Sequence, residues 1–280
     1  MNYLLILISA FIFQFNFLSD DYIEVHEISG IVTDNDDNPI GYAHIGVIGV
    51  SNGTVANKSG LFSLDISQTS NNDTLFISAI GFKTKKYSLG ELLFQDTMHV
   101  TLERKVYLSN DISITAKKSD VITFGRDKSG GNSGWAYSGI ATGNEIGMIY
   151  RNDKNIVLSE FKFHIRATNF DSLLYRVHVY ETLNDKMIHL NKTNIQKSSA
   201  TSDGWVELEL SDFQLVTNQD FCITVEVLEG WKNGHISRRG SIQFTGRNTI
   251  SKQMLQRSHQ YIKAQKERIQ LNMFVTGFSY

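Results

Sequence analysis

His178 and Glu181 stand in a His-x-x-Glu pattern, a spacing that zinc sites use when both side chains reach one ion. The residues around this pair alternate between apolar and polar, as in a β-strand, and residues three apart in a strand point to opposite faces. The two side chains are therefore not expected to share a metal, and a site would have to recruit His235 or His259 without a supporting motif. The sequence accordingly predicts no metal ligand, no cofactor and no catalytic residue.

Ser133 lies in the turn Gly131-Asn-Ser-Gly134, which is similar to the turns that carry the nucleophile of serine hydrolases. A nucleophilic serine needs an adjacent base that is itself held in place by a third group. No motif nominates such a His and Asp pair, so the segment is predicted to be a flexible linker.

Asp34, Asp36 and Asn38 alternate as the first oxygen ligands of a calcium-binding loop do. Such a loop needs Gly at its sixth position and a bidentate Glu at its twelfth, where this chain has Pro39 and Ile45. A turn between two strands is favoured, and weak calcium binding is the alternative.

Two strand-like segments, 160–167 and 174–181, place apolar residues on one face and charged or aromatic residues on the other. If the two strands pair, one outer surface carries Lys162, His164, Arg166, Arg176, His178 and Tyr180. Cations beside an aromatic ring suit a sugar acid or a phosphate, so these six residues form the candidate ligand-binding site. The alternative is an ordinary solvated sheet face.

Positive charge is concentrated in residues 232–268, which hold nine cations and the single acid Glu267. This segment suits an anionic partner such as lipopolysaccharide, an acidic glycan or nucleic acid. A solvated helix and loop facing the acidic first part of the chain is the alternative. The whole chain balances 27 Lys and Arg against 29 Asp and Glu, which argues against a dedicated nucleic-acid-binding protein.

Short strand-like segments separated by Asn, Asp and Gly run through most of the chain. Before residue 105 they cover 28–33, 43–50, 60–66, 74–80, 84–88 and 98–102. After residue 139 they cover 160–167, 174–181, 204–210, 221–228, 241–245 and 271–278. This pattern predicts an all-β protein with two antiparallel β-sandwich domains in tandem. Apolar residues at helical spacing also predict a helix over 250–269, late in the second domain.

The first group of strands carries an ordered series of motifs: Gly30-Ile-Val-Thr-Asp34, Pro39-Ile-Gly-Tyr-Ala43, Asn52-Gly-Thr54, Ser59-Gly-Leu-Phe62 and Leu75-Phe-Ile-Ser-Ala-Ile-Gly-Phe82. Over residues 28–116 the chain resembles the carboxypeptidase-like regulatory domain. That family is a transthyretin-like β-sandwich, an accessory of metallocarboxypeptidases and the front domain of TonB-dependent outer-membrane receptors. The 164 residues that follow are too few for a receptor plug and barrel or for a complete carboxypeptidase. The resemblance therefore implies a fold and a setting in a Gram-negative envelope, and no activity.

These patterns divide the chain into four parts. Residues 1–20 are predicted to be a signal peptide, because an apolar run of about 16 residues precedes Asp20 and is short for a membrane span. An uncleaved anchor or a buried strand is the alternative. Residues 21–104 form the regulatory-like sandwich, 105–139 a linker and 140–280 the second sandwich. After cleavage no membrane span remains, and the single Cys222 suits an exported protein because it has no partner for an incorrect disulfide.

The sequence therefore predicts a non-enzymatic, exported binding or assembly module, located in the periplasm, at the outer membrane or on the cell surface. Its β-sandwich surfaces would engage an envelope protein or a glycan. The alternatives are a carbohydrate-binding module and an accessory subunit of an envelope carboxypeptidase or other hydrolase.

Overall fold

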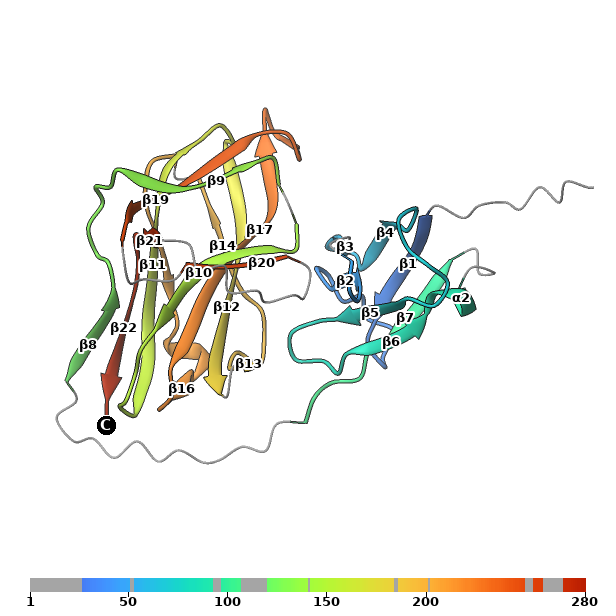
Figure 1. Cartoon of the computed structure of the whole chain (residues 1–280), viewed down its shortest axis with the longest axis horizontal. Coiled ribbons are helices and arrows are strands. Elements are labelled where there is room, and N and C mark those ends of the chain that lie inside the picture. The colour runs from blue at the N-terminus through green and yellow to red at the C-terminus, as the bar shows by residue number, and fades with distance from the viewer. Residues whose placement is uncertain are drawn as a thin grey trace, which may run out of the picture.

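A computed structural model describes residues 27–280 except 51–52, 93–96, 107–119, 141, 184–185, 201, 250–253 and 259–268. These residues form two β-sandwich domains, which confirms the all-β prediction (Figure 1). The predicted signal peptide over residues 1–20 lies outside the described residues. No helix within the described ranges has the length and apolar character needed to cross a membrane.

The first domain contains two small sheets. Its elements are β1 (Glu27–Thr33), β2 (His44–Val47), β3 (Gly53–Val55), β4 (Leu61–Asp65), β5 (Thr74–Ser78), β6 (Lys85–Ser88), α2 (Leu89–Leu92) and β7 (Met98–Thr101). One sheet has the order β4-β1-β7 and the other β3-β2-β5-β6. All pairs are antiparallel except β1 with β7, which is parallel. The core lies between the sheets, because apolar side chains alternate inward along strands such as β4.

Gly60 illustrates why the turns of this domain need glycine. Its φ of +77° lies in the left-handed region, and a Cβ atom there would stand 2.5 Å from the carbonyl oxygen of Val32. The residue allows the chain to turn tightly into β4, and its role is therefore in folding.

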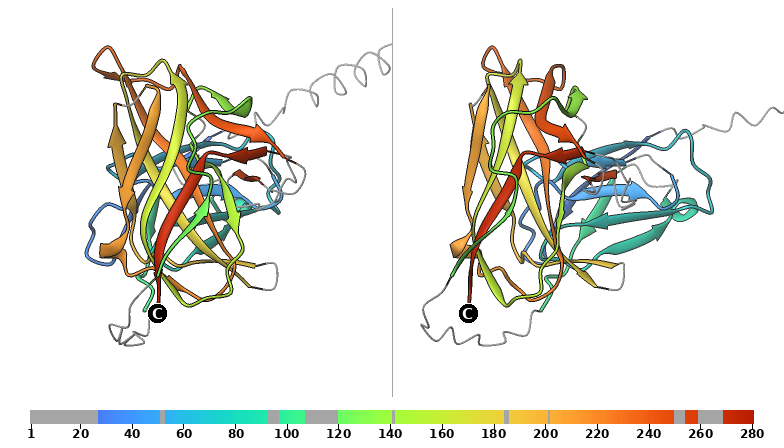
Figure 2. Two further views of the ribbon diagram at one scale, coloured as in Figure 1. Left: turned by 90° about the vertical axis from the view of Figure 1, so that its left-hand side faces the viewer. Right: turned by 60° about the vertical axis from the view of Figure 1, so that its left-hand side comes forward.

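The second domain is a larger sandwich whose two layers are seen in Figure 2. One layer has the order β13-β12-β17-β10-β20, with β14 and β18 at its margins. Its strands are β10 (Asn144–Tyr150), β12 (Ser172–Leu183), β13 (Lys186–His189), β14 (Ile195–Ser199), β17 (Phe221–Lys232), β18 (His235–Ile236) and β20 (Met254–Ser258).

The other layer has the order β21-β19-β11-β22-β8, with β9, β15 and β16 paired to it. Its strands are β8 (Val121–Gly125), β9 (Ser133–Ser138), β11 (Ile156–Thr168), β15 (Gly204–Glu209), β16 (Val216–Thr217), β19 (Ser241–Asn248), β21 (Ile269–Leu271) and β22 (Met273–Ser279). The short helix η2 (Ser211–Phe213) follows β15. Phe161, Phe163 and Ile165 of β11 point into the core between the layers, as the alternation predicted.

The linker is shorter than the sequence predicted. Strands β8 and β9 lie within 105–139, yet β8 pairs with β22 and β9 pairs with β19. The second sandwich therefore begins before residue 140. Ser133 accordingly starts a strand rather than lying in a flexible linker, because the small residues around it allow β9 to approach β19 closely.

The structure does not support a helix over 250–269. Residues 254–258 form strand β20, which pairs with β10, and Ile269 begins β21. Residues 250–253 and 259–268 lie outside the described residues. Sheet pairing at the edge of β10 outweighs the weak helical periodicity of this segment.

Candidate functional site

The six residues of the predicted ligand-binding surface do not share one surface. Strand β11 carries Lys162, His164 and Arg166, whereas β12 carries the other three, and the two strands belong to opposite layers of the sandwich. The predicted pairing of these strands is therefore wrong. Each strand pairs instead within its own layer, β11 with β15, β16, β19 and β22, and β12 with β13, β14 and β17. Whether the individual residues bind a ligand stays a prediction.

The outer side of the β11 layer carries an aromatic cluster that we call the aromatic face, formed by Lys162, His164, Trp205 and Phe274. His164 lies opposite Trp205 in the strand register, and Lys162 lies opposite Phe274. The Trp205 ring meets His164 at 5.0 Å and Phe274 at 5.2 Å between centroids, in edge-to-face geometry. Trp205 and Phe274 are both partly buried, so each residue keeps some surface accessible to solvent.

Polar groups surround these rings. Nζ of Lys162 lies 3.0 Å from Glu160 and 3.1 Å from Glu207, and these carboxylates raise the pKa of Lys162 above its ordinary value. Burial lowers the pKa of His164, which is hydrogen-bonded to the Thr245 hydroxyl at 2.9 Å. The face thus combines apolar rings with fixed hydrogen-bonding groups.

The outer side of the β12 layer is covered by the first domain (Figure 1). Tyr42 and Val55 of the first domain pack with Leu228 and Leu174 of the second. The Tyr42 hydroxyl also donates to the Glu229 carboxylate at 2.9 Å. Burial and this hydrogen bond raise the pKa of Tyr42 to about 12. The two domains are therefore in direct contact through a small apolar patch with a polar margin.

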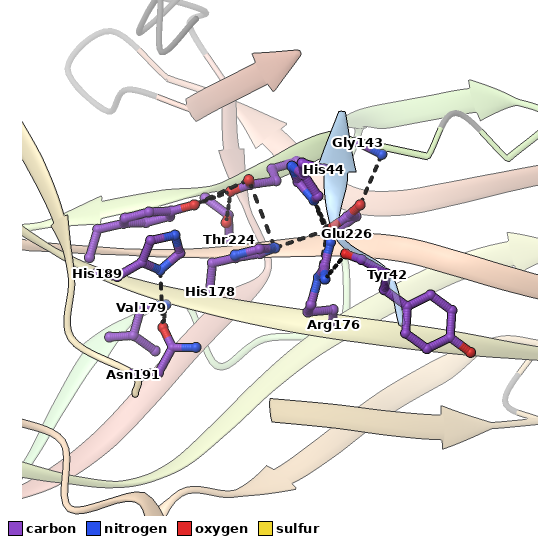
Figure 3. Close-up of polar contacts among 12 residues, drawn as sticks. Tyr42, His44, Gly143, Arg176, His178, Val179, His189, Asn191, Thr224 and Glu226 are labelled. Atoms are coloured by element: carbon purple, nitrogen blue, oxygen red, sulfur yellow. Dashed lines mark hydrogen bonds and ion pairs between the residues drawn. The ribbon is translucent and has the colours of Figure 1, made fainter. Parts of the chain in front are cut away.

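Beside this patch lies a group of buried ionisable residues that we call the interdomain cluster: His44, Glu145, Arg176, His178 and Glu226 (Figure 3). Arg176 is central to it. Its Nε and Nη2 donate to Oε2 of Glu226 at 2.9 and 2.7 Å, and its Nη1 donates to the Tyr42 carbonyl at 2.6 Å. Arg176 is 1% exposed and Glu226 is fully buried. The alternative that the sequence offered, an ordinary solvated sheet face, is therefore wrong for the Arg176 side of β12.

Two imidazoles converge on the same carboxylate. Nε2 of His44 and Nε2 of His178 lie 3.3 and 3.0 Å from Oε2 of Glu226, while the Gly143 amide donates to Oε1 at 2.9 Å. Nη2 of Arg176 also contacts Nε2 of His44. A guanidinium group only donates, so Nε2 of His44 presents its lone pair to the cluster.

Glu145 is the second carboxylate of the cluster. It accepts from the Tyr180 hydroxyl at 2.9 and 3.1 Å and from the Thr224 hydroxyl at 2.6 Å, and Nε2 of His178 lies 3.8 Å from it. Two buried carboxylates thus face one permanently charged cation.

Burial and neighbouring charges shift the pKa values of His44 and Glu226, the two groups that meet across the domain contact. It lowers the pKa of His44, which favours the neutral imidazole. Burial alone would raise the pKa of Glu226, but the opposite charge of Arg176 and the contacts with His44 and His178 hold it well below the usual range. Glu226 is therefore ionised within the interface.

A cavity of about 200 Å³ adjoins the cluster at the domain junction. Its lining includes His44, Glu145, Arg176, His178 and His189. Nδ1 of His178 is buried and has no hydrogen-bond partner among the described residues. The cavity is large enough for a small polar molecule or ion to contact the His178 side chain.

The remaining motifs have structural roles. The Asp34 carboxylate accepts from the backbone amides of Asp36 and Asn38 at 3.0 Å each and pairs with Arg104 at 3.1 Å, as the predicted turn requires. Glu181 binds the Thr217 hydroxyl at 2.6 Å, on the face opposite to His178, which confirms that the two do not converge. Cys222 is buried.

The basic segment 232–268 is described only in part. Lys232 and Arg247 belong to β17 and β19, and Arg238 and Arg239 lie between β18 and β19. Lys252, Lys263, Lys266 and Arg268 lie outside the described residues. Its anionic partner therefore stays a prediction.

Sequence reasoning missed His44, Glu145 and Glu226 as members of a site. His44 lies in a predicted strand, and Glu226 lies between the apolar residues of another. Glu226, Val225 and Thr224 are all buried, which signals a strand covered on both faces. A charged residue such as Glu226 within a strand of this kind needs a buried partner of opposite charge. A glutamate inside an apolar run is therefore the sequence feature that could have indicated this cluster.

Residues 28–115 match the family model of the CarboxypepD_reg-like domain. The match covers the stretch whose motifs resembled the carboxypeptidase-like regulatory domain, and it confirms that resemblance. The first domain is thus a CarboxypepD_reg-like β-sandwich fused to a second sandwich. No curated protein matches the chain.

Several solved structures show a remote likeness. The cysteine protease and lectin-like domains of Cwp84, a surface layer associated protein of Clostridium difficile, are 10% identical, with 91% of this chain and 58% of that chain covered and a TM-score of 0.38. The chain therefore spans less than two thirds of that protein. A structure of carbohydrate-binding modules from the β-sandwich superfamily is 10% identical, with 78% and 95% covered and a TM-score of 0.21. Scores this low carry no functional argument.

Proposed function

We propose that this protein is a non-enzymatic binding module of the bacterial cell envelope and that the aromatic face binds a glycan. The observation that carries the proposal is the partly exposed pair Trp205 and Phe274, flanked by Lys162 with its two carboxylate neighbours. Sugar rings present C–H groups that pack on aromatic rings and hydroxyls that exchange hydrogen bonds with charged side chains. The face supplies both.

The arrangement of the domains supports this choice of surface. The outer side of the β12 layer is used by the first domain, whose Tyr42 and Val55 pack on it. The aromatic face lies on the opposite layer, with β8 and β22 (Figure 1). A ligand can therefore approach this face while the domains remain docked.

Export to the envelope belongs to the proposal as well. The apolar amino-terminal run and the family match of residues 28–115 support it. In this setting the CarboxypepD_reg-like domain acts as a spacer and the second sandwich as the ligand-binding part.

We expect Trp205→Ala to reduce the affinity for the glycan about 5- to 30-fold, because loss of one aromatic contact of this kind removes about 1–2 kcal/mol. Lys162→Ala should have a smaller effect in the same direction. The measurement is retention of the purified protein on immobilised acidic and neutral polysaccharides, followed by calorimetric titration with those that retain it.

Phe278→Ala is the matched control, because Phe278 lies on the same strand as Phe274 and is 43% exposed. It should bind as the unmodified protein does. Equal binding by Trp205→Ala and Phe278→Ala would show that the aromatic face is not the site. No retention on any polysaccharide would reject the glycan and leave a protein partner as the ligand of the module.

A further inference from the structure

The interdomain cluster brings together three side-chain atoms of the kinds that bind metal ions. Nε2 of His44, Nε2 of His178 and a carboxylate oxygen of Glu226 all lie within 4.8 Å of one another. Donor atoms around a tetrahedral zinc ion are about 3.3 Å apart, since each bond is about 2.0–2.1 Å. The two nitrogen-to-oxygen distances, 3.3 and 3.0 Å, match that separation.

The protonation states suit a metal as well. Metal ligands must be neutral imidazoles and ionised carboxylates. Nε2 of His44 already presents its lone pair to the Arg176 guanidinium, and the Glu226 carboxylate accepts hydrogen bonds from Arg176 and from the Gly143 amide. His178 coordinates through Nε2 when its proton moves to Nδ1, the buried atom without a hydrogen-bond partner among the described residues.

The surroundings provide outer-shell groups and room for a further ligand. Gly143 and Arg176 fix the Glu226 carboxylate, and Glu145 lies 3.8 Å from His178. Such hydrogen bonds orient the ligands of metal sites. The adjoining cavity of about 200 Å³ has room for a water molecule as a fourth ligand.

We propose that His44, His178 and Glu226 bind one divalent transition-metal ion, with zinc as the favoured ion for two imidazoles and one carboxylate. His44 belongs to the first domain, whereas His178 and Glu226 belong to the second. The ion therefore joins the two domains, and its binding strengthens their docking.

Arg176 limits the affinity of this site. Its Nη2 contacts the same His44 nitrogen that the metal needs, so the guanidinium and the ion compete. If the metal displaces Nη2 from His44, Arg176 still donates to the Tyr42 carbonyl through Nη1. Removing its charge should therefore strengthen metal binding, which is the opposite of what a loss of folding would do.

The test is a calorimetric titration of the chelator-treated protein with Zn²⁺, supported by metal analysis after dialysis. We expect one ion per chain in the unmodified protein and loss of that site in His44→Ala, His178→Ala and Glu226→Gln. His99→Ala and His235→Ala, which change exposed histidines, should keep it. Arg176→Met should raise the affinity by at least about tenfold, because a unit charge a few ångströms away is removed.

The absence of a saturable site in the unmodified protein, or binding by His44→Ala and His178→Ala as tight as that of the unmodified protein, would overturn the proposal. If the histidine variants unfold, the visible spectrum of Co²⁺ added to the unmodified protein tests the site instead. Visible absorption bands of a tetrahedral nitrogen and oxygen site support the assignment, and a spectrum identical to aqueous Co²⁺ contradicts it. Neither outcome depends on glycan binding.

Discussion

Arg176→Met is expected to destabilise the protein by about 3–5 kcal/mol, because breaking a buried ion pair leaves an uncompensated charge in the interior. Arg176 is 1% exposed and makes two hydrogen bonds to Glu226, which is fully buried. It also supplies the Tyr42 carbonyl with a donor from the other domain. In the metal-free protein the substitution therefore lowers the stability of the second domain and weakens its contact with the first, and an ion bound by His44, His178 and Glu226 would offset this loss by replacing the missing positive charge.

The measurement is urea unfolding followed by tryptophan fluorescence, which reports on the second domain because all three tryptophans lie after residue 130. Arg151→Met is the matched control. Arg151 pairs with Asp220, but its side chain is 88% exposed, so its loss should change the unfolding free energy by less than about 1 kcal/mol. Equal effects of the two substitutions would show that the interdomain cluster contributes little to stability.

Phe163→Ala is expected to lower the unfolding free energy by about 3–5 kcal/mol, the usual result of removing a fully buried aromatic ring. Phe163 is completely buried, and its ring lies 5.0 Å from Tyr175 and 6.0 Å from Phe244. It joins the two layers of the sandwich, and its neighbours in β11 are Lys162 and His164 of the aromatic face. The core on one side of this strand therefore positions Lys162 and His164 of the aromatic face on the other.

Phe278→Ala, which truncates a side chain that is 43% exposed, should cost less than about 1 kcal/mol in the same urea experiment. Comparable losses for the two phenylalanine variants would mean that the layers are not packed through Phe163.

The sequence predicted which residues of each strand face the core, and it did not predict what covers the other face. Alternation in β11 and β12 correctly separates Phe163 from His164 and Val177 from His178. Period-two alternation is a local property of the strand, so it holds without knowledge of neighbours. The layer to which each strand belongs depends on pairing partners far along the chain, such as β15 for β11 and β17 for β12.

The interdomain cluster was beyond sequence reasoning for the same physical reason. His44 and Arg176 are 132 residues apart and meet only because two domains dock. The family match of the first domain fixes its fold and says nothing about its partner surface. Of the residues in the aromatic face, Lys162 and His164 were named from the sequence, whereas Trp205 and Phe274 lie beside them only through the register of β15 and β22 with β11.

The most direct test of the central claim, that the aromatic face binds a glycan, is the fluorescence of Trp205 during titration with a retained polysaccharide. Substituting Trp135→Phe and Trp231→Phe leaves Trp205 as the only tryptophan. We predict a saturable change in its emission and protection from acrylamide quenching, because a sugar ring covers the exposed part of the indole. Binding detected by calorimetry without a change in the emission or quenching of Trp205 would contradict glycan binding at the aromatic face.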